Sequence, residues 1–256
     1  MQSTFPLREI EISIQNGSIK LRVLDNSGGI LENCDQDSLP YFADLWPTGV
    51  GMSLLLSSGC VDFKNKIILD VGSGTGIVAI VAAKMGGQVY ATDYLESCID
   101  LIRQNVALNQ LQDQVQILQL DWNEPHLWPT KVDYIVASDI LYESFHIKPI
   151  AKLFHTILSN GGTAILCDPD RSQLANSFRK ELEEMGENVF IHNKKQFPCI
   201  DNTSSCKFIE ISQSSIQESS PYFKYLMSEN SVFSEYKEEA EVSVDIPPPP
   251  FVNKQP

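Results

Sequence analysis

A glycine-rich segment is the part of the sequence best suited to bind a ligand through its backbone. The segment Gly72-Ser73-Gly74-Thr75-Gly76 follows the short apolar run Ile67–Val71. A strand that ends in glycines and continues into a helix brings backbone amide groups close to a ligand at the carboxyl edge of a sheet. The three glycines and Ser73 are therefore candidate ligand-binding residues. The alternative is a tight turn between strand and helix that holds no ligand.

A carboxylate stands where it could bind a ribose. Asp93 ends a second apolar run, 88–92, about twenty positions after the glycines. A carboxylate at the tip of the second strand can accept hydrogen bonds from both hydroxyls of a ribose. The same side chain can also cap the helix that follows, and the two roles are compatible. Together, the glycines and Asp93 predict a site for a ribose-bearing ligand.

The elements that position these residues form a repeating strand–helix pattern. Apolar runs typical of buried strands lie at 67–71, 88–92, 115–120, 134–138, 163–167, 189–192 and 206–211. Apolar residues at helical spacing separate most of them, but no helical pattern separates the last two. Alternation of this kind predicts a mostly parallel α/β sheet with helices on both faces, and the last two strands should form an antiparallel pair at one edge. We expect a Rossmann-like, seven-stranded fold.

The chain opens with a hairpin pattern. Isoleucines alternate with polar residues over 10–14, and apolar residues alternate again over 19–23, on either side of Asn16-Gly17. Asn-Gly between two alternating runs is a strong signal for a two-residue turn. We expect an N-terminal hairpin and loop over 1–40, one α/β domain over 41–214 and a disordered, acidic and Pro-rich tail over 215–256.

Composition limits the classes of partner. The chain has 33 acidic and 19 basic residues and a net charge of −14, which repels phosphate backbones and argues against nucleic acid. No apolar run is long enough for a membrane helix, and the first residues resemble neither a signal nor a transit peptide. The six cysteines show no metal-ligand or disulfide spacing. We therefore expect no metal, no membrane partner and a reducing, cytoplasmic location that could extend to the nucleus.

Three further motifs accompany the glycine segment. They are Leu45-Trp46-Pro47 before the first main-domain helix, Leu120-Asp121-Trp122 after the third apolar run, and Ser138-Asp139-Ile140-Leu141-Tyr142 after the fourth. With the glycines and Asp93, they resemble the class I S-adenosylmethionine-dependent methyltransferases. More narrowly, the chain resembles family 16, the nicotinamide-N-methyltransferase-like group that contains seven-β-strand protein-lysine methyltransferases. The resemblance runs from the hairpin to about Ser212 and leaves out the tail.

The resemblance implies roles for single residues. Trp46 and Trp122 would contact the cofactor, S-adenosylmethionine, whose adenine can stack on indole. The glycine segment would pack on its methionine and ribose side, Asp93 would bind the ribose, and Ser138 would line the cofactor. Asp121 either bonds the adenine amino group or caps the following turn.

Asp139 and Tyr142 are the candidates for the acceptor side. A lysine amine has an unperturbed pKa of about 10.4 and must lose a proton before it can accept a methyl group. A carboxylate at Asp139 could orient the ammonium, and Tyr142 could position it by its hydroxyl or its ring. The alternative is that Asp139 caps a helix and Tyr142 only packs.

The resemblance favours lysine in a protein substrate as the acceptor. A small-molecule amine, or arginine or histidine in a protein, stays open, and so does a non-catalytic scaffold with this fold. The N/D-P-P-Y/F motif of amino-methylating nucleic-acid enzymes is not found after the fourth run. The segment 167–171 resembles the D-P-x-R segment of the electron-transfer-flavoprotein branch, although an Asp-Pro turn explains it equally well. We expect a monomer, and the run Pro247–Pro250 could dock a Pro-binding module.

Overall fold

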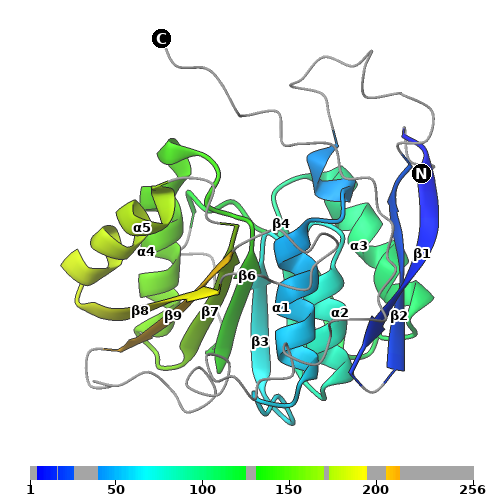
Figure 1. Cartoon of the computed structure of the whole chain (residues 1–256), viewed down its shortest axis with the longest axis horizontal. Helices are drawn as coiled ribbons and strands as arrows, with labels where there is room; N and C mark the ends of the chain where they lie inside the picture. The colour runs from blue at the N-terminus through cyan, green and yellow to red at the C-terminus, as the bar shows by residue number, and fades with distance from the viewer. Residues whose placement is uncertain are drawn as a thin grey trace.

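A central sheet dominates the computed structural model, which describes residues 5–15, 17–25, 40–124, 131–169, 173–194 and 206–213. Within these residues the sheet has seven strands in the order β5-β4-β3-β6-β7-β9-β8 (Figure 1). The strands are β3 (Ile67–Val71), β4 (Gln88–Asp93), β5 (Val115–Gln119), β6 (Tyr134–Ser138), β7 (Thr163–Asp168), β8 (Glu187–Lys194) and β9 (Cys206–Gln213). β3 to β7 run parallel, and β9 pairs antiparallel with both β7 and β8. The predicted sheet and its antiparallel edge pair are confirmed.

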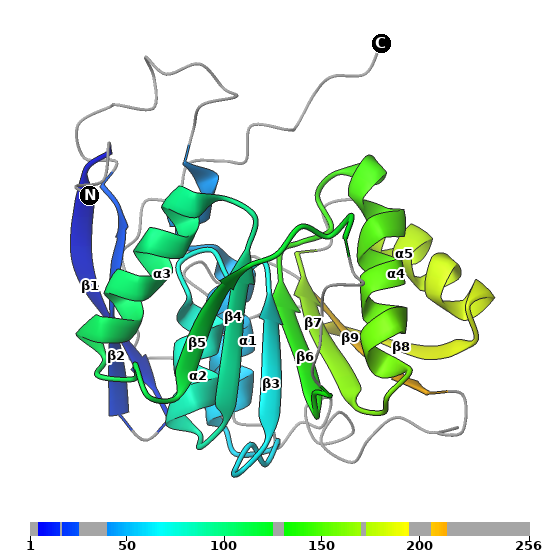
Figure 2. The same ribbon diagram turned by 180° about the vertical axis from the view of Figure 1, so that it is seen from behind.

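Helices cover both faces of the sheet (Figures 1 and 2). The α-helices are α1 (Pro47–Ser57), α2 (Ile77–Lys84), α3 (Glu96–Leu108), α4 (Ile147–Leu158) and α5 (Leu174–Glu184). Short 3-10 helices span Tyr41–Ala43 (η3) and Ser144–His146 (η5). α1 begins at Pro47, three residues before the predicted apolar segment, because proline lacks an amide hydrogen and suits the first helical turn.

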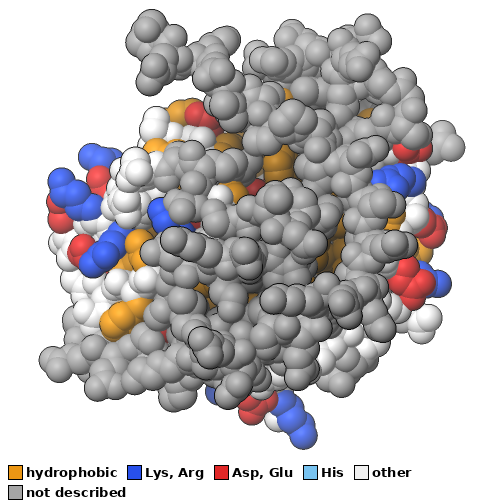
Figure 3. All heavy atoms as spheres, viewed as in Figure 1, with side chains coloured by type: hydrophobic (Ala, Val, Ile, Leu, Met, Phe, Trp, Pro, Cys, Tyr) orange, Lys and Arg blue, Asp and Glu red, His pale blue; other side chains and the backbone are white. Residues whose placement is uncertain are grey.

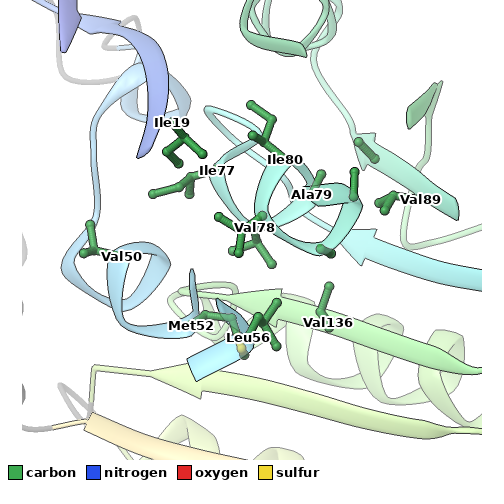
Figure 4. Packing of buried hydrophobic residues seen from close by; sticks show 14 of the residues in the cluster. Ile19, Val50, Met52, Leu56, Ile77, Val78, Ala79, Ile80, Val89 and Val136 are labelled. Carbon is green, nitrogen blue, oxygen red and sulfur yellow. The ribbon is translucent and has the colours of Figure 1, made fainter. Parts of the chain in front are cut away.

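Two hydrophobic clusters explain why the central strands read as continuous apolar runs. Adjacent residues of a strand point to opposite faces, so Ile68 packs in the cluster with α1, α2 and the hairpin, whereas Leu69 packs in the cluster with α4 and α5. Figure 4 shows the first cluster, where Met52 and Leu56 of α1 approach Val136 of the sheet. A parallel strand that is buried on both faces needs apolar residues at most positions, and the buried Asp70 is the exception in β3.

The N-terminal hairpin forms a separate two-stranded sheet, β1 (Leu7–Ile14) and β2 (Gly17–Leu24). Ile14 pairs with Gly17, so Gly17 belongs to the strand and the two residues between the strands are 15 and 16. The turn therefore lies one residue earlier than the predicted Asn16-Gly17 centre. Both registers keep the isoleucines on one face, so the alternation alone could not distinguish them. Residue 16 and the tail predicted over 215–256 lie outside the described residues.

The carboxyl ends of the parallel strands meet at one edge of the sheet. The glycine segment follows β3, Asp93 ends β4, and Asp139 directly follows β6. β3 lies between β4 and β6, so these residues are neighbours in space although they are far apart in the chain. Ligands of open α/β sheets bind at this edge.

Candidate active site

The glycine segment is fastened to the end of β4. The backbone amide of Ser73 donates to the carbonyl of Thr92 (2.9 Å), and the Ser73 hydroxyl oxygen accepts from the Thr92 amide (3.0 Å). Gly72, Gly74 and Gly76 have φ angles of +70°, +53° and +80°, a region that favours glycine. The segment therefore keeps its shape through its own backbone contacts.

Gly72 brings three of the sequence motifs together. A Cβ atom at this position would lie 2.8 Å from Cγ2 of Ile140 and 3.3 Å from Cζ2 of Trp122. Ile140 belongs to the motif after β6, and Trp122 to the motif after β5. The absence of a side chain at Gly72 is therefore required for these segments to meet beside the glycine segment.

Asp93 uses its carboxylate to hold the backbone on both sides of the site. One oxygen, Oδ2, accepts from the Gly74 amide (3.2 Å), and the other accepts from the amides of Tyr94 (2.8 Å) and Leu95 (3.3 Å). These two amides precede α3, which has no side-chain capping bond at its start, so the helix-capping role that the sequence left open is not observed. An ionised carboxylate has about four acceptor positions, so the three backbone contacts leave a position for one ribose hydroxyl and not for both.

The buried Asp70 contacts the residues that flank the glycine segment, a role that sequence reasoning did not assign. Its Oδ2 accepts from the amide of Ala79 in α2 (3.1 Å). Burial raises the pKa of Asp70 to about 7, against the opposing effect of hydrogen bonds from Ser73 and Ala79. Cys98 of α3 also donates to the Gly74 carbonyl (3.2 Å), and burial raises the pKa of its thiol.

The two motif tryptophans lie in different surroundings. Trp46 precedes α1, and its Nε1 donates to the carbonyl of Tyr41 (3.0 Å). The half-buried Trp122 meets the ring of His146 edge-on at 5.1 Å. The carboxylate of Asp121 accepts from the backbone amide and side-chain amide of Asn123, both at 2.8 Å, so the turn-capping alternative is the contact observed.

α1 packs directly against the end of β6. A Cβ atom on Gly49 would lie 3.6 Å from Oγ of Ser138. Next to it, the buried Thr48 hydroxyl donates to Oδ2 of Asp139 (3.3 Å). Sequence reasoning missed Thr48, although it directly follows the Leu45-Trp46-Pro47 motif.

Asp139 itself has an unusual backbone conformation. Its φ angle is +57°, a region that aspartate enters more readily than most residues, and its amide donates to the carbonyl of Cys167 in β7 (3.0 Å). This turn directs the chain away from the sheet directly after β6. The carboxylate is held from the opposite side by Thr48 of α1.

Tyr142 and Phe145 extend from the segment after Asp139 and are 52% and 68% exposed. Between them, His146 contacts both rings, at centroid distances of 6.1 Å and 4.2 Å. Burial lowers the pKa of His146, although Glu143 and Asp121 act in the opposite direction. Burial also raises the pKa of Tyr142, and the negative charge of Asp93 raises it further. Sequence reasoning missed His146 and Phe145.

The predicted site residues thus gather at one sheet edge, in two groups. The glycine segment, Asp93 and Trp122 lie together near β3 and β4, while Ser138, Asp139 and Tyr142 follow β6. Trp46 lies at the start of α1, and Thr48 of the same helix contacts Asp139 of the second group. The buried Asp168 ends β7 at the same edge, but residues 170 and 171 of the D-P-x-R segment lie outside the described residues. Among the residues described, no cluster of three or more metal-binding side chains occurs, and no helix is long and apolar enough to cross a membrane.

Comparisons with known proteins identify a family that the chain matches. A family model described as lysine methyltransferase matches residues 32–185. Protein N-lysine methyltransferase METTL21A of Danio rerio is 36% identical over 138 residues, which cover 52% of this chain and 62% of that protein. EEF1A lysine methyltransferase 3 of Mus musculus is 27% identical, with 59% and 69% covered. Protein arginine N-methyltransferase 1 of Saccharomyces cerevisiae is 28% identical, with 63% and 52% covered.

A solved structure shares the architecture. The crystal structure of a methyltransferase from Pyrococcus furiosus has a TM-score of 0.51 with this chain at 18% identity, and the match covers 64% of this chain and 83% of that one. At this identity the likeness shows the fold alone. The expected Rossmann-like methyltransferase fold is confirmed.

Proposed function

The chain belongs to the lysine methyltransferase family, whose model spans more than half of its residues, and we propose on this basis that it methylates the side-chain amine of lysine in a protein substrate. The methyl donor of this family and fold is S-adenosylmethionine. The observation that carries the assignment is the meeting of the glycine segment and Asp139 at one sheet edge, where a bound donor and an acceptor amine can face each other.

The residues at this edge fit the cofactor. The contact at Gly72 puts the glycine segment next to the indole of Trp122, and an indole ring can stack on a flat adenine. In our proposal the glycine segment and Asp93 hold the ribose and methionine side, Trp46 and Trp122 contact the cofactor, and Ser138 lines it. The cofactor supplies an electrophilic methyl group bound to a sulfonium.

The acceptor chemistry falls to the residues after β6. A lysine enters the site as an ammonium ion, because its unperturbed pKa is about 10.4. The carboxylate of Asp139, held by Thr48, accepts a hydrogen bond from the ammonium and aligns its nitrogen. The proton passes to water, and the neutral amine is then oriented for in-line attack. Tyr142 stands beside this position and restricts how the amine can approach.

Exposed apolar side chains favour a protein as the carrier of the lysine. Among the described residues, the large apolar side chains that are exposed are Tyr94, Leu95, Leu118, Tyr142 and Phe145. All of them lie near or after the carboxyl ends of β4, β5 and β6. Clustered exposed apolar residues mark surfaces that bind other proteins. We call these five residues the apolar rim, and we propose that it contacts residues that flank the target lysine.

Charge argues against a nucleic-acid acceptor. The net charge of −14 repels phosphate. On the flank formed by α4 and α5, acidic and basic side chains lie side by side (Figure 3), as in the ion pairs Arg179–Glu183 and Lys148–Glu181. The proposed location is the cytoplasm, where the four described cysteines would keep their free thiols.

The similarity to a protein arginine methyltransferase favours arginine as the second candidate acceptor. The two candidates differ in the product. Complete acid hydrolysis of the labelled protein releases methyl-lysine or methyl-arginine, and chromatography separates the two.

The test is transfer of tritiated methyl groups from S-adenosylmethionine to proteins of a cell extract that lacks this enzyme. We expect a labelled protein band whose hydrolysate contains methyl-lysine. Asp139→Asn should abolish the band, and Glu184→Gln on the exposed surface of α5 is the control. Methyl-arginine would move the assignment to the second candidate. Label in RNA or in small molecules alone would contradict a protein acceptor.

The role of the apolar rim has its own test. Phe145→Ser should weaken labelling of the protein band about five-fold or more, because exposed aromatic anchors dominate protein contacts. Binding of S-adenosylhomocysteine should be unchanged. Equal labelling by the variant and the unaltered chain would remove Phe145 from the proposed surface.

A further inference from the structure

The edge of the hairpin that faces α3 is closed by two asparagine side chains. Asn105 and Asn109 lie one turn apart on α3, and Lys20 and Arg22 are two apart on β2. The Asn109 amide oxygen accepts from the Lys20 amide (3.0 Å), and its nitrogen donates to the Lys20 carbonyl (2.6 Å). Asn105 binds the amide and the carbonyl of Arg22 in the same way, at 2.6 Å and 3.0 Å.

These contacts replace a missing neighbour strand. Residues two apart in a strand direct their backbone groups to the same edge, and unpaired groups at such an edge are normally covered or paired. Two asparagines at helical spacing provide the matching donors and acceptors. The hairpin is thereby docked on α3 through backbone recognition in addition to its apolar face.

Asn105 makes one contact that Asn109 does not. The second hydrogen of its side-chain nitrogen is donated to the carbonyl of Thr75 in the glycine segment (2.8 Å). Asn105 is completely buried, and Thr75 is 4% exposed. Its one amide group therefore connects β2, α3 and the glycine segment at a buried position, where the loss of a hydrogen bond is costly.

The glycine segment is sensitive to this position of α3. A Cβ atom on Gly76 would lie 3.3 Å from Cγ2 of Ile102, one turn before Asn105. Cys98, further back on α3, donates to the carbonyl of Gly74. A shift of α3 at Asn105 would therefore displace the backbone that faces the cofactor.

We propose that Asn105 is a positioning residue for S-adenosylmethionine, and that through it the N-terminal hairpin and the cofactor site stabilise each other. This inference rests on the cofactor of the family and not on the identity of the acceptor. Coupling between two sites is reciprocal, so a well-docked hairpin raises the affinity for the cofactor, and the bound cofactor holds the hairpin on α3.

A pair of variants separates this role from general stability. In Asn105→Ala both contacts are lost, to the hairpin and to Thr75, whereas Asn109→Ala loses the hairpin contact and leaves Thr75 held. Calorimetric titration of the full chain with S-adenosylhomocysteine should show affinity weakened at least about five-fold for Asn105→Ala. Asn109→Ala should bind within about two-fold of the unaltered chain, although both variants melt at lower temperatures. Equal affinity of the two variants would overturn the proposal.

A measurement on the unaltered chain covers the case in which Asn105→Ala does not fold. Hydrogen exchange is followed with and without saturating S-adenosylhomocysteine. Exchange in β2 should slow more on binding than exchange in β8, which lies at the far edge of the main sheet. Equal slowing in the two strands would mean that the hairpin is not coupled to the cofactor site. Failure of the unaltered chain to bind S-adenosylhomocysteine would instead contradict the cofactor assignment itself.

Discussion

The cofactor side of the sheet edge, after β3 and β4, and the acceptor side, after β6, are held in different ways. On the cofactor side, Ser73, Asp93 and Asp70 bind backbone groups of the glycine segment and its flanking elements. On the acceptor side, Asp139 turns with a left-handed φ, and the chain continues into the exposed Tyr142 and Phe145.

The difference indicates a division of work. A segment whose own hydrogen bonds fix its shape is organised before the ligand arrives, which lowers the entropy cost of binding. This suits a cofactor that is the same in every turnover. Exposed aromatic side chains near Asp139 suit a surface that can be adapted to one protein substrate. The comparison predicts that changes on the cofactor side abolish binding, whereas changes on the acceptor side spare binding and reduce transfer.

The largest effect is expected from Gly72→Ala. The new Cβ atom would lie 2.8 Å from Ile140, at a φ of +70°, and backbone strain of this kind alone costs about 1–3 kcal/mol. We expect no measurable binding of S-adenosylhomocysteine by calorimetry. Gly186→Ala is the control, because Gly186 has a φ of +91° but open space around it. Normal binding by Gly72→Ala would show that the cofactor does not lie along this segment.

Asp139→Asn should break the acceptor side alone. Asparagine tolerates a left-handed φ, so the turn after β6 is retained while the negative charge is lost. We expect methyl transfer to fall about 1,000-fold, within the range for residues that handle protons. The affinity for S-adenosylhomocysteine should stay within about two-fold. A comparable loss of cofactor affinity would mean that the two sides are not separate.

Asp70→Asn tests how much the buried carboxyl on the cofactor side lowers the free energy of unfolding. Its pKa is about 7 in the folded chain, against a reference value of 3.8. Between these values the folded chain keeps a proton that the unfolded chain releases, so the carboxyl makes the fold less stable as pH rises from about 4 to 7. The variant should gain about 2–4 kcal/mol relative to the unaltered chain across this window. Denaturant unfolding at several pH values measures the difference, with the exposed Asp113→Asn as the control.

The sequence predicted the strands and the local turns better than the contacts between distant residues, for a physical reason. The limits of β3 and β6 were predicted correctly, because a strand buried on both faces is apolar along most of its length. The glycines and Asp93 are local signals that follow directly from a strand–helix turn. The turn of the hairpin was misplaced by one residue because both registers satisfy the same alternation.

Contacts between distant residues escaped prediction. Thr48 meets Asp139 across 91 positions and Asn105 meets Arg22 across 83, and neither pairing leaves a pattern in the local sequence. Asp121 and Asp93 illustrate a related limit, since a carboxylate after a strand can cap a turn or bind a ligand. The structure shows the turn-capping contact of Asp121, whereas Asp93 binds two amides that precede α3. Their contacts with the cofactor remain predictions.

Thr48→Val should give the smallest effect, and it tests whether α1 orients the carboxylate of the acceptor side. Valine has the shape of threonine but cannot donate to Oδ2 of Asp139, and a hydrogen bond to a charged group contributes about 1.5–3 kcal/mol. Because the carboxylate remains in place and loses only its orientation, we expect transfer to fall about ten-fold. Thr48→Ser keeps the hydroxyl and should transfer at close to the normal rate. Single-turnover rates with saturating cofactor measure this step apart from cofactor binding. If Thr48→Val and Thr48→Ser reduce the rate equally, packing of α1 against β6 matters at this position and the hydrogen bond does not.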